Sequence, residues 1–224
     1  MTLPRPPAAV VFDMDGVLFD TETLYEQAAL AAARELGFEM TTTFFRSTVG
    51  SPWNVNRARL LEEYGADLQV DHLNAVAGRL FDGLIENRSL LKPGAAELLN
   101  LLEERRLPRA IATSSSRATV ERHLQSHSLG DHFHQIVARG DYEQHKPHPE
   151  PYLLAASKVC VAPERCVAIE DSYHGVRSAS AAGMMTLMVP DLLPPTEEIA
   201  ALCLRVVPDL HAVRHLIHSA LQSA

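Results

Sequence analysis

The stretch Ala8-Ala9-Val10-Val11-Phe12-Asp13-Met14-Asp15-Gly16-Val17 sets an apolar run directly before two carboxylates and a glycine. Short, uninterrupted apolar runs are typical of strands that are buried on both faces of a parallel sheet. Gly16 allows the chain to turn sharply after such a strand without a clash from a Cβ atom. We therefore predict a buried strand that delivers Asp13 and Asp15 to one edge of a sheet.

Comparable apolar runs recur along the chain and alternate with helical patterns. Further strands are predicted over Ala110–Ala112, Gln135–Ala138, Cys166–Ile169, Met185–Val189 and Leu204–Val207. Apolar residues at helical spacing predict helices over Gly94–Arg106, Ala118–His127, Glu150–Val159 and Leu210–Leu221. Strands that alternate with helices predict an α/β fold with a doubly wound parallel sheet and right-handed crossovers.

One segment interrupts this alternation. Residues 21–90 contain no convincing strand, only helical patterns over Glu22–Leu36, Val55–Tyr64 and Leu73–Ile85. This segment is far longer than a crossover needs. We therefore expect a core domain of residues 1–20 and 91–224 and an inserted all-α cap of residues 21–90.

Composition excludes several classes of protein. The 224 residues carry a net charge of −8, which argues against nucleic acid as a partner, because backbone binding depends on Lys and Arg. The three cysteines have no metal-binding spacing and fit a reducing compartment. We find no signal peptide and no uncharged stretch of membrane-spanning length. The expectation is a soluble, cytoplasmic monomer without a membrane or nucleic-acid partner.

Polar residues follow four of the predicted strands. The first strand leads to Asp13 and Asp15, and the second leads to Thr113-Ser114-Ser115-Ser116. Lys146 follows the third strand, and Glu170-Asp171 ends the fourth. Ligands of open α/β sheets bind outside the carboxyl ends of the strands, so we expect these groups to meet in one site.

Phosphoryl transfer to a carboxylate requires groups of this kind. A phosphomonoester repels a carboxylate nucleophile, so a divalent cation is needed, and Mg²⁺ prefers oxygen ligands. The predicted metal ligands are Asp13, Asp15 through its backbone carbonyl, Asp171 and Glu170. Asp13 is the predicted nucleophile, and Asp15 is the predicted acid for the leaving oxygen and base for water.

The remaining predicted site residues bind the phosphate or the rest of the substrate. The Ser114 hydroxyl, the Ser115 amide and the Lys146 ammonium are expected to hold the transferring group. The other candidates for substrate or phosphate binding are Gly16, Thr21, Ser116, Arg117 and the aromatic Trp53.

The four motifs resemble those of the haloacid dehalogenase superfamily. They are Asp13-Met14-Asp15-Gly16-Val17-Leu18-Phe19-Asp20-Thr21-Glu22, Thr113-Ser114-Ser115, Lys146-Pro147 and Glu170-Asp171-Ser172. The resemblance spans nearly the whole chain and is closest to the branch of β-phosphoglucomutase and sugar-phosphate phosphatases. It implies a flavodoxin-like core, a helical cap after the first motif, bound Mg²⁺ and transfer through the first aspartate to or from a small phosphorylated metabolite.

Departures from the mutase favour hydrolysis. The mutase uses a histidine just after its first motif and cationic residues in its cap. Tyr25 stands at the position of that histidine, and the loop Gly50-Ser51-Pro52-Trp53-Asn54 carries Trp53 where the mutase has an arginine. Lysine is absent from residues 21–91. We therefore predict a phosphatase, with a phosphosugar mutase as the alternative.

Other interpretations of the same residues remain open. A phospho-accepting receiver domain also combines an aspartate, Mg²⁺ and a lysine on such a sheet, but it needs neither Asp15 nor a long insert. Ser114 and Ser115 could cap the following helix, and Glu170-Asp171 could be a solvated pair at a helix start. Trp53 could pack in the cap core, and Arg57 and Arg117 could be surface charges or hold a distal anionic group of the substrate.

Overall fold

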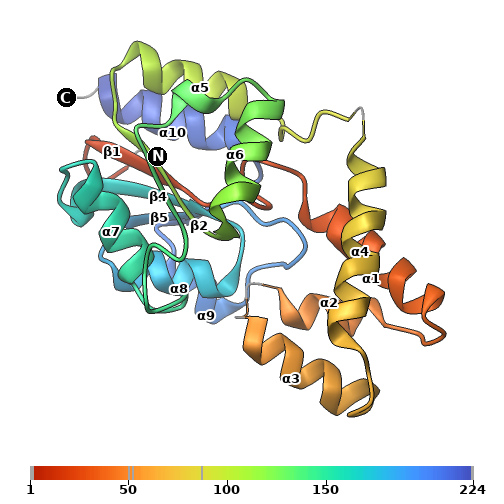
Figure 1. The fold of residues 1–224 in the computed structure, drawn as a ribbon. Coiled ribbons are helices and arrows are strands. Elements are labelled where there is room, and N and C mark those ends of the chain that lie inside the picture. Colours follow the sequence, from red (N-terminus) through yellow and green to blue (C-terminus); the bar gives the residue numbers. More distant parts are fainter. Residues whose placement is uncertain (1–2, 50, 52, 87, 223–224) are drawn as a thin grey trace. The chain divides into compact units, whose positions relative to one another are not determined.

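The computed structural model describes residues 3–49, 51, 53–86 and 88–222. Within these residues, the main unit is built on a parallel sheet of six strands in the order β3-β2-β1-β4-β5-β6 (Figure 1). The strands are β1 (Ala9–Phe12), β2 (Arg109–Ser116), β3 (Gln135–Arg139), β4 (Cys166–Glu170), β5 (Met185–Met188) and β6 (Arg205–Val206). This arrangement confirms the predicted fold class.

The helices of this unit cover both faces of the sheet. They are α5 (Ala95–Glu104), α6 (Arg117–Ser126), α7 (Glu150–Lys158), α8 (Tyr173–Ala181), α9 (Glu197–Leu202) and α10 (Leu210–Gln222). Figure 1 shows α5 and α10 together on one side of the sheet and α7 and α8 on the other. Two 3-10 turns, Gly130–His132 and Pro163–Arg165, precede β3 and β4.

Strand β1 lies at the centre of the sheet, where the chain order reverses. Its residues are fully buried, and Val11 pairs with Ala110 of β2 on one side and Ala168 of β4 on the other. Both neighbours carry small side chains, so α7 packs closely and brings Tyr152 into the core. The crevice of a doubly wound sheet forms at such a reversal, which here lies between the carboxyl ends of β1 and β4.

The second unit, Asp20–Leu90, is entirely helical in its described residues. It comprises α1 (Glu22–Glu35), α2 (Thr42–Thr48), α3 (Trp53–Tyr64) and α4 (Val70–Ile85). Helices α1 and α4 form its core, and the ring of Tyr25 stacks on Phe81 at a centroid distance of 3.9 Å. The main unit takes the remaining chain, Met1–Phe19 and Leu91–Ala224. That the helical unit acts as a cap stays a prediction.

The sequence patterns located all six strands and missed three helices. Helix α8 reads YHGVRSASA, and its glycine and serines give it little helical character. Helices α2 and α9 are short, with seven and six residues. None of the helices in the described parts of the chain combines the length and the apolarity that crossing a membrane demands.

Candidate active site

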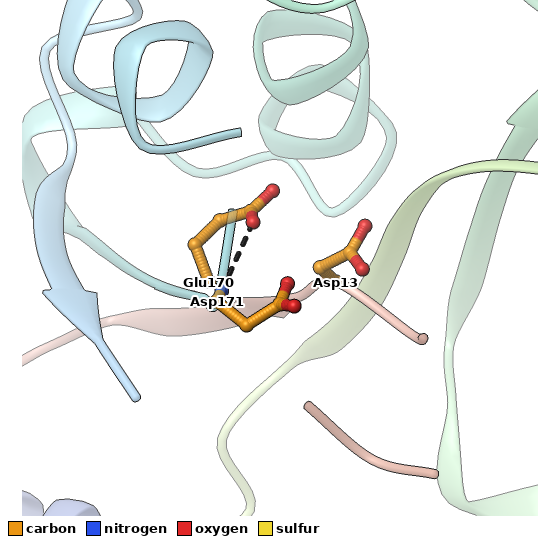
Figure 2. A group of neighbouring side chains, drawn as sticks. All are labelled: Asp13, Glu170 and Asp171. Carbon is orange, nitrogen blue, oxygen red and sulfur yellow. Dashed lines mark hydrogen bonds between the residues drawn. The ribbon is translucent and has the colours of Figure 1, made fainter. Parts of the chain in front are cut away.

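Three acidic side chains meet at the carboxyl ends of β1 and β4. The Asp13 amide donates to the Ile169 carbonyl at 2.9 Å, which continues the β1–β4 pairing to the residue that follows β1. Asp13 and the pair Glu170-Asp171 therefore reach the same edge of the sheet. One carboxylate oxygen from each lies within 4.8 Å of those of the other two, and all three side chains are buried. Figure 2 shows the Asp13 carboxylate facing those of Glu170 and Asp171.

Lys146 joins two of these carboxylates. Its ammonium lies 2.6 Å from Asp13 Oδ1 and 2.6 Å from Glu170 Oε1, and its side chain is 4% exposed. A buried ammonium needs such partners, because desolvation penalises an unpaired charge heavily. The lysine of the third motif is thus fixed directly beside the predicted nucleophile.

Glu170 is held by protein groups on both of its oxygens. Oε1 accepts from Lys146 and also from the Tyr152 hydroxyl at 2.6 Å. Oε2 accepts from the amides of Asp171 and Ser172 at 3.1 and 3.3 Å and from the Ser172 hydroxyl at 3.2 Å. Gly175 packs against this carboxylate so closely that a Cβ there would overlap it. These contacts suit a residue that orients Lys146 and the start of α8. No motif in the sequence marks Tyr152, so its place in the site could not be predicted.

The three carboxylates at this edge, when ionised, carry more charge than the ammonium of Lys146 offsets. Desolvation by burial raises the pKa of Asp13 to about 7, with Lys146 opposing the rise and Glu170 adding to it. Burial acts to lower the pKa of Lys146, but the charges of Asp13 and Glu170 outweigh it and raise that pKa above its ordinary value. Three clustered carboxylates against one ammonium leave excess negative charge. Buried carboxylate oxygens of this kind are the ligands that Mg²⁺ prefers, so the residues present fit that ion.

Asp15 receives a hydrogen bond from the second strand end. The Ser115 hydroxyl donates to Asp15 Oδ2 at 2.6 Å. Gly16 has a φ of +76°, and its amide donates to the Phe19 carbonyl at 2.9 Å. The left-handed turn at Gly16 thus redirects the chain immediately after Asp15. The structure brings Asp13, Asp15, Gly16, Ser115 and Lys146 together, as the strand ends led us to expect.

The other hydroxyl residues of the second strand end lie in different environments. Strand β2 continues to Ser116, with an irregular register after Ala112. Ser114 is exposed, whereas the Ser115 amide donates to Thr113 Oγ1 at 3.1 Å. Ser116 accepts from the Thr119 amide and caps α6.

Arg117 does not point into this group of residues. Its guanidinium binds Asp141 Oδ2 at 2.6 Å and the Ile136 carbonyl at 3.1 Å. The Arg117 side chain is also 43% exposed. These contacts match the interpretation as a surface charge.

The candidate residues of the second unit have different environments within it. Thr21 is fully buried and its carbonyl accepts from the Tyr25 amide, at the start of α1. Trp53 begins α3 and is 41% exposed, and Arg57 is also exposed. Gly50 and Pro52, which precede Trp53 in the loop named above, lie outside the described residues.

Comparisons with known proteins point to one family. A family model described as haloacid dehalogenase-like hydrolase matches residues 10–189. Hexitol phosphatase B of Escherichia coli K12 is 32% identical over 205 residues, covering 85% of this chain and 86% of that protein. A phosphorylated carbohydrates phosphatase of Thermotoga maritima is 32% identical over 180 residues, covering 79% of this chain and 82% of the relative.

Solved structures agree with these matches. CbbY from Rhodobacter sphaeroides, in complex with xylulose-(1,5)bisphosphate, has a TM-score of 0.77 at 28% identity. The alignment covers 91% of this chain and 95% of that protein. The likeness therefore includes nearly the full length of both chains.

Proposed function

Because this chain belongs to the haloacid dehalogenase-like hydrolase family, we propose that it is a magnesium-dependent phosphatase of a small sugar phosphate. The observation that carries the proposal is the contact between the Lys146 ammonium and Asp13 Oδ1, beside the cluster of Asp13, Glu170 and Asp171. The substrate class rests on the relatives, which are named as phosphatases of hexitol phosphates and of phosphorylated carbohydrates.

Asp13 and Asp171 would hold the cation through their carboxylates, and Asp15 through its backbone carbonyl. When bound, Mg²⁺ supplies positive charge that reduces the repulsion between an anionic phosphate and a carboxylate nucleophile. We assign Glu170 to the orientation of Lys146 and the start of α8 rather than to direct binding of the cation, because five protein donors already occupy its two oxygens. Lys146 supplies the fixed positive charge on the transferring group.

Asp13 attacks phosphorus and forms an acyl phosphate while the phosphorus–oxygen bond of the ester breaks. Asp15 gives its proton to the leaving oxygen, so the alcohol departs neutral. A water molecule then attacks phosphorus and gives its proton to Asp15, which releases phosphate and restores the Asp13 carboxylate. Ser115 keeps Asp15 on the side of the turn where both proton transfers occur.

The phosphate oxygens are assigned to Lys146, to the exposed Ser114 hydroxyl and to the N-terminal end of α6, where helix geometry favours anions. Arg117 is left out of this site because Asp141 already pairs with it. That Thr21 and Trp53 contact the substrate stays a prediction.

Two substitutions test the assigned roles. Asp13→Asn should remove essentially all turnover, because an amide cannot attack phosphorus as a carboxylate does. Asp15→Asn should still form the acyl phosphate from a substrate with a good leaving group and then stall. Mass spectrometry of the Asp15→Asn protein, quenched during turnover of p-nitrophenyl phosphate, should locate the phosphoryl group on Asp13. A phosphoryl group on any other residue, or full activity in EDTA, would refute the proposal.

A further inference from the structure

Asp191 lies beside the proposed cation site, although no step above uses it. It follows β5, and its Oδ1 accepts a 2.5 Å hydrogen bond from Lys92 Nζ. Both side chains are largely buried, with exposed fractions of 17% for Lys92 and 11% for Asp191. The second oxygen, Asp191 Oδ2, is buried and has no hydrogen-bond partner among the described residues. A buried carboxylate oxygen without a donor is unfavourable, so its environment calls for an explanation.

Gly16 shows where this oxygen points. A Cβ atom built on Gly16 would lie 3.3 Å from Asp191 Oδ2 and 2.2 Å from Asp171 Oδ2. Asp171 Oδ2 thus overlaps the position of that missing Cβ atom, and Asp191 Oδ2 lies within contact distance of the same position. They are close enough for one water molecule to contact both. Asp171 is a proposed metal ligand, and Asp15, whose carbonyl is another, directly precedes Gly16.

The chemistry of Mg²⁺ suggests which group bridges these two oxygens. Mg²⁺ keeps several of its water ligands and binds directly to only one or two carboxylates. Asp13 and Asp171 already supply those carboxylates, whereas a retained water has hydrogen atoms to donate. Lys92 offsets the charge of Asp191, so this carboxylate can approach the site without adding net repulsion toward an anionic substrate.

We propose that Asp191 is a positioning residue whose Oδ2 accepts a hydrogen bond from a water ligand of the bound cation, while Lys92 offsets the charge of the carboxylate through Oδ1. The inference rests on the proposed function, because it requires a cation at Asp13 and Asp171. It extends the site to β5, which supplies no residue of the four motifs.

Direct binding of Mg²⁺ tests the proposal without reference to turnover. The full chain is freed of metal, and MgCl₂ is titrated by calorimetry and by the rise in melting temperature. Asp191→Asn keeps the shape and an acceptor for Lys92, but it presents an amide donor where the water needs an acceptor. We expect its dissociation constant for Mg²⁺ to rise about 10-fold, as is typical when an outer partner of a metal site is lost. Asp191→Ala, which also lacks the acceptor, should behave in the same way.

Two variants separate this role from a structural one. Lys92→Met breaks the same ion pair but leaves the Asp191 acceptor, so its Mg²⁺ affinity should stay near the wild-type value. Glu198→Gln breaks the exposed pair with Arg177 and serves as the control for loss of a carboxylate elsewhere. Melting temperatures in EDTA show whether each variant is folded.

The outcomes are distinct. Weaker Mg²⁺ binding in Asp191→Asn together with near wild-type binding in Lys92→Met supports the proposal. Equal weakening in both variants would overturn it, because the pair would then only hold the loop after β5. Unchanged binding in Asp191→Asn would overturn it and leave the proposed function intact. A wild-type protein that binds no Mg²⁺ would overturn both.

Discussion

The hydroxyl of Ser115 donates a 2.6 Å hydrogen bond to Oδ2 of Asp15, across two strand ends that are far apart in the sequence. Ser115→Ala removes this bond and with it one restraint on the orientation of the Asp15 carboxylate. We expect kcat to fall about 10-fold with a sugar phosphate, because misplacement of an acid–base group weakens proton transfer. The loss should be smaller with p-nitrophenyl phosphate, whose leaving group needs little protonation.

Steady-state kinetics with both substrates measures this difference. Ser126→Ala is the matched control, because Ser126 lies on α6 and its hydroxyl donates to the Arg122 carbonyl within the same helix. Equal losses for the two substrates would show that Ser115 does not act through Asp15.

Gly16→Ala should disrupt the site through a steric clash rather than through backbone strain alone. The new Cβ would lie 2.2 Å from Asp171 Oδ2, and φ at this position is +76°. Gly183→Ala provides the matched control, since Gly183 has a φ of +80° and, apart from its chain neighbours, no described residue places an atom within 4 Å of its ideal Cβ. Both substitutions carry a strain cost of about 1–2 kcal/mol in unfolding free energy.

We expect only Gly16→Ala to abolish Mg²⁺ binding, as measured by calorimetry. Retention of Mg²⁺ binding by Gly16→Ala would show that Asp171 can move away without loss of the cation site.

The positions of the candidate site residues along the chain could be predicted from the sequence, because these residues follow the ends of predicted strands. Asp13 and Glu170-Asp171 end neighbouring strands, and parallel pairing of β1 with β4 alone brings them to one edge. The contacts that orient the side chains of the site could not be predicted from the sequence. Tyr152 binds Glu170 from inside α7, and Asp191 approaches Gly16 from the segment after β5. Both contacts depend on small residues that allow α7 and the segment after β5 to approach closely. No local sequence pattern predicts how close that approach is.

The second strand end illustrates the same limit. A row of hydroxyl residues predicts an anion site, but it does not say which hydroxyl serves which partner. In the structure, Ser115 binds Asp15, Ser116 caps α6, and Thr113 accepts from an amide. The register of β2 against β3 also shifts between Ala112 and Ser116, and the row of hydroxyl residues gives no sign of that shift.

Tyr152→Phe should destabilise the protein because it leaves Glu170 with one buried donor fewer. The Tyr152 hydroxyl is fully buried and donates to Glu170 Oε1 at 2.6 Å. Loss of a buried hydrogen bond to a charged group lowers the unfolding free energy by about 1.5–3 kcal/mol. Tyr173→Phe is the control, because the Tyr173 hydroxyl donates to the Pro194 carbonyl in an exposed position. Urea denaturation in EDTA measures the unfolding free energy of both variants. Equal losses would contradict the role assigned to the buried hydrogen bond between Tyr152 and Glu170.

Acidification should stabilise the metal-free site through Asp13. Burial raises the pKa of Asp13 from 3.8 to about 7, so between these pH values the folded state holds a proton that the unfolded state lacks. This contribution to stability is present at low pH and is lost as the pH rises through about 7. Asp13→Asn removes the titration, and in EDTA it should be more stable than the wild type above pH 7.

The difference in stability between Asp13→Asn and the wild type should shrink as the pH falls from 7 toward 5. Paired urea denaturation curves of the wild type and Asp13→Asn, recorded at several pH values, measure the difference directly. A difference in unfolding free energy that does not change with pH would show that Asp13 ionises in the metal-free protein as readily as an ordinary aspartate.

The final acceptor of the phosphoryl group decides between a phosphatase and a phosphosugar mutase. A mutase must keep its acyl phosphate from water until a sugar hydroxyl arrives, which requires acid–base help from the helical unit. Tyr25 stands where the mutase has a histidine, and its ring stacks on Phe81 within that unit. The hydroxyl of a tyrosine, with an ordinary pKa near 10, is a poor proton relay at neutral pH compared with an imidazole.

We therefore expect β-glucose 1-phosphate, where it is accepted, to yield free glucose and inorganic phosphate. A coupled assay with glucose-6-phosphate dehydrogenase and a sugar bisphosphate activator detects any glucose 6-phosphate, and a parallel assay measures phosphate release. Phosphate release should exceed NADPH formation throughout the reaction, because water reaches the Asp13 acyl phosphate before a second sugar does. NADPH formation that outpaces phosphate release would establish a mutase, and it would show that the helical unit protects the acyl phosphate without a histidine at position 25.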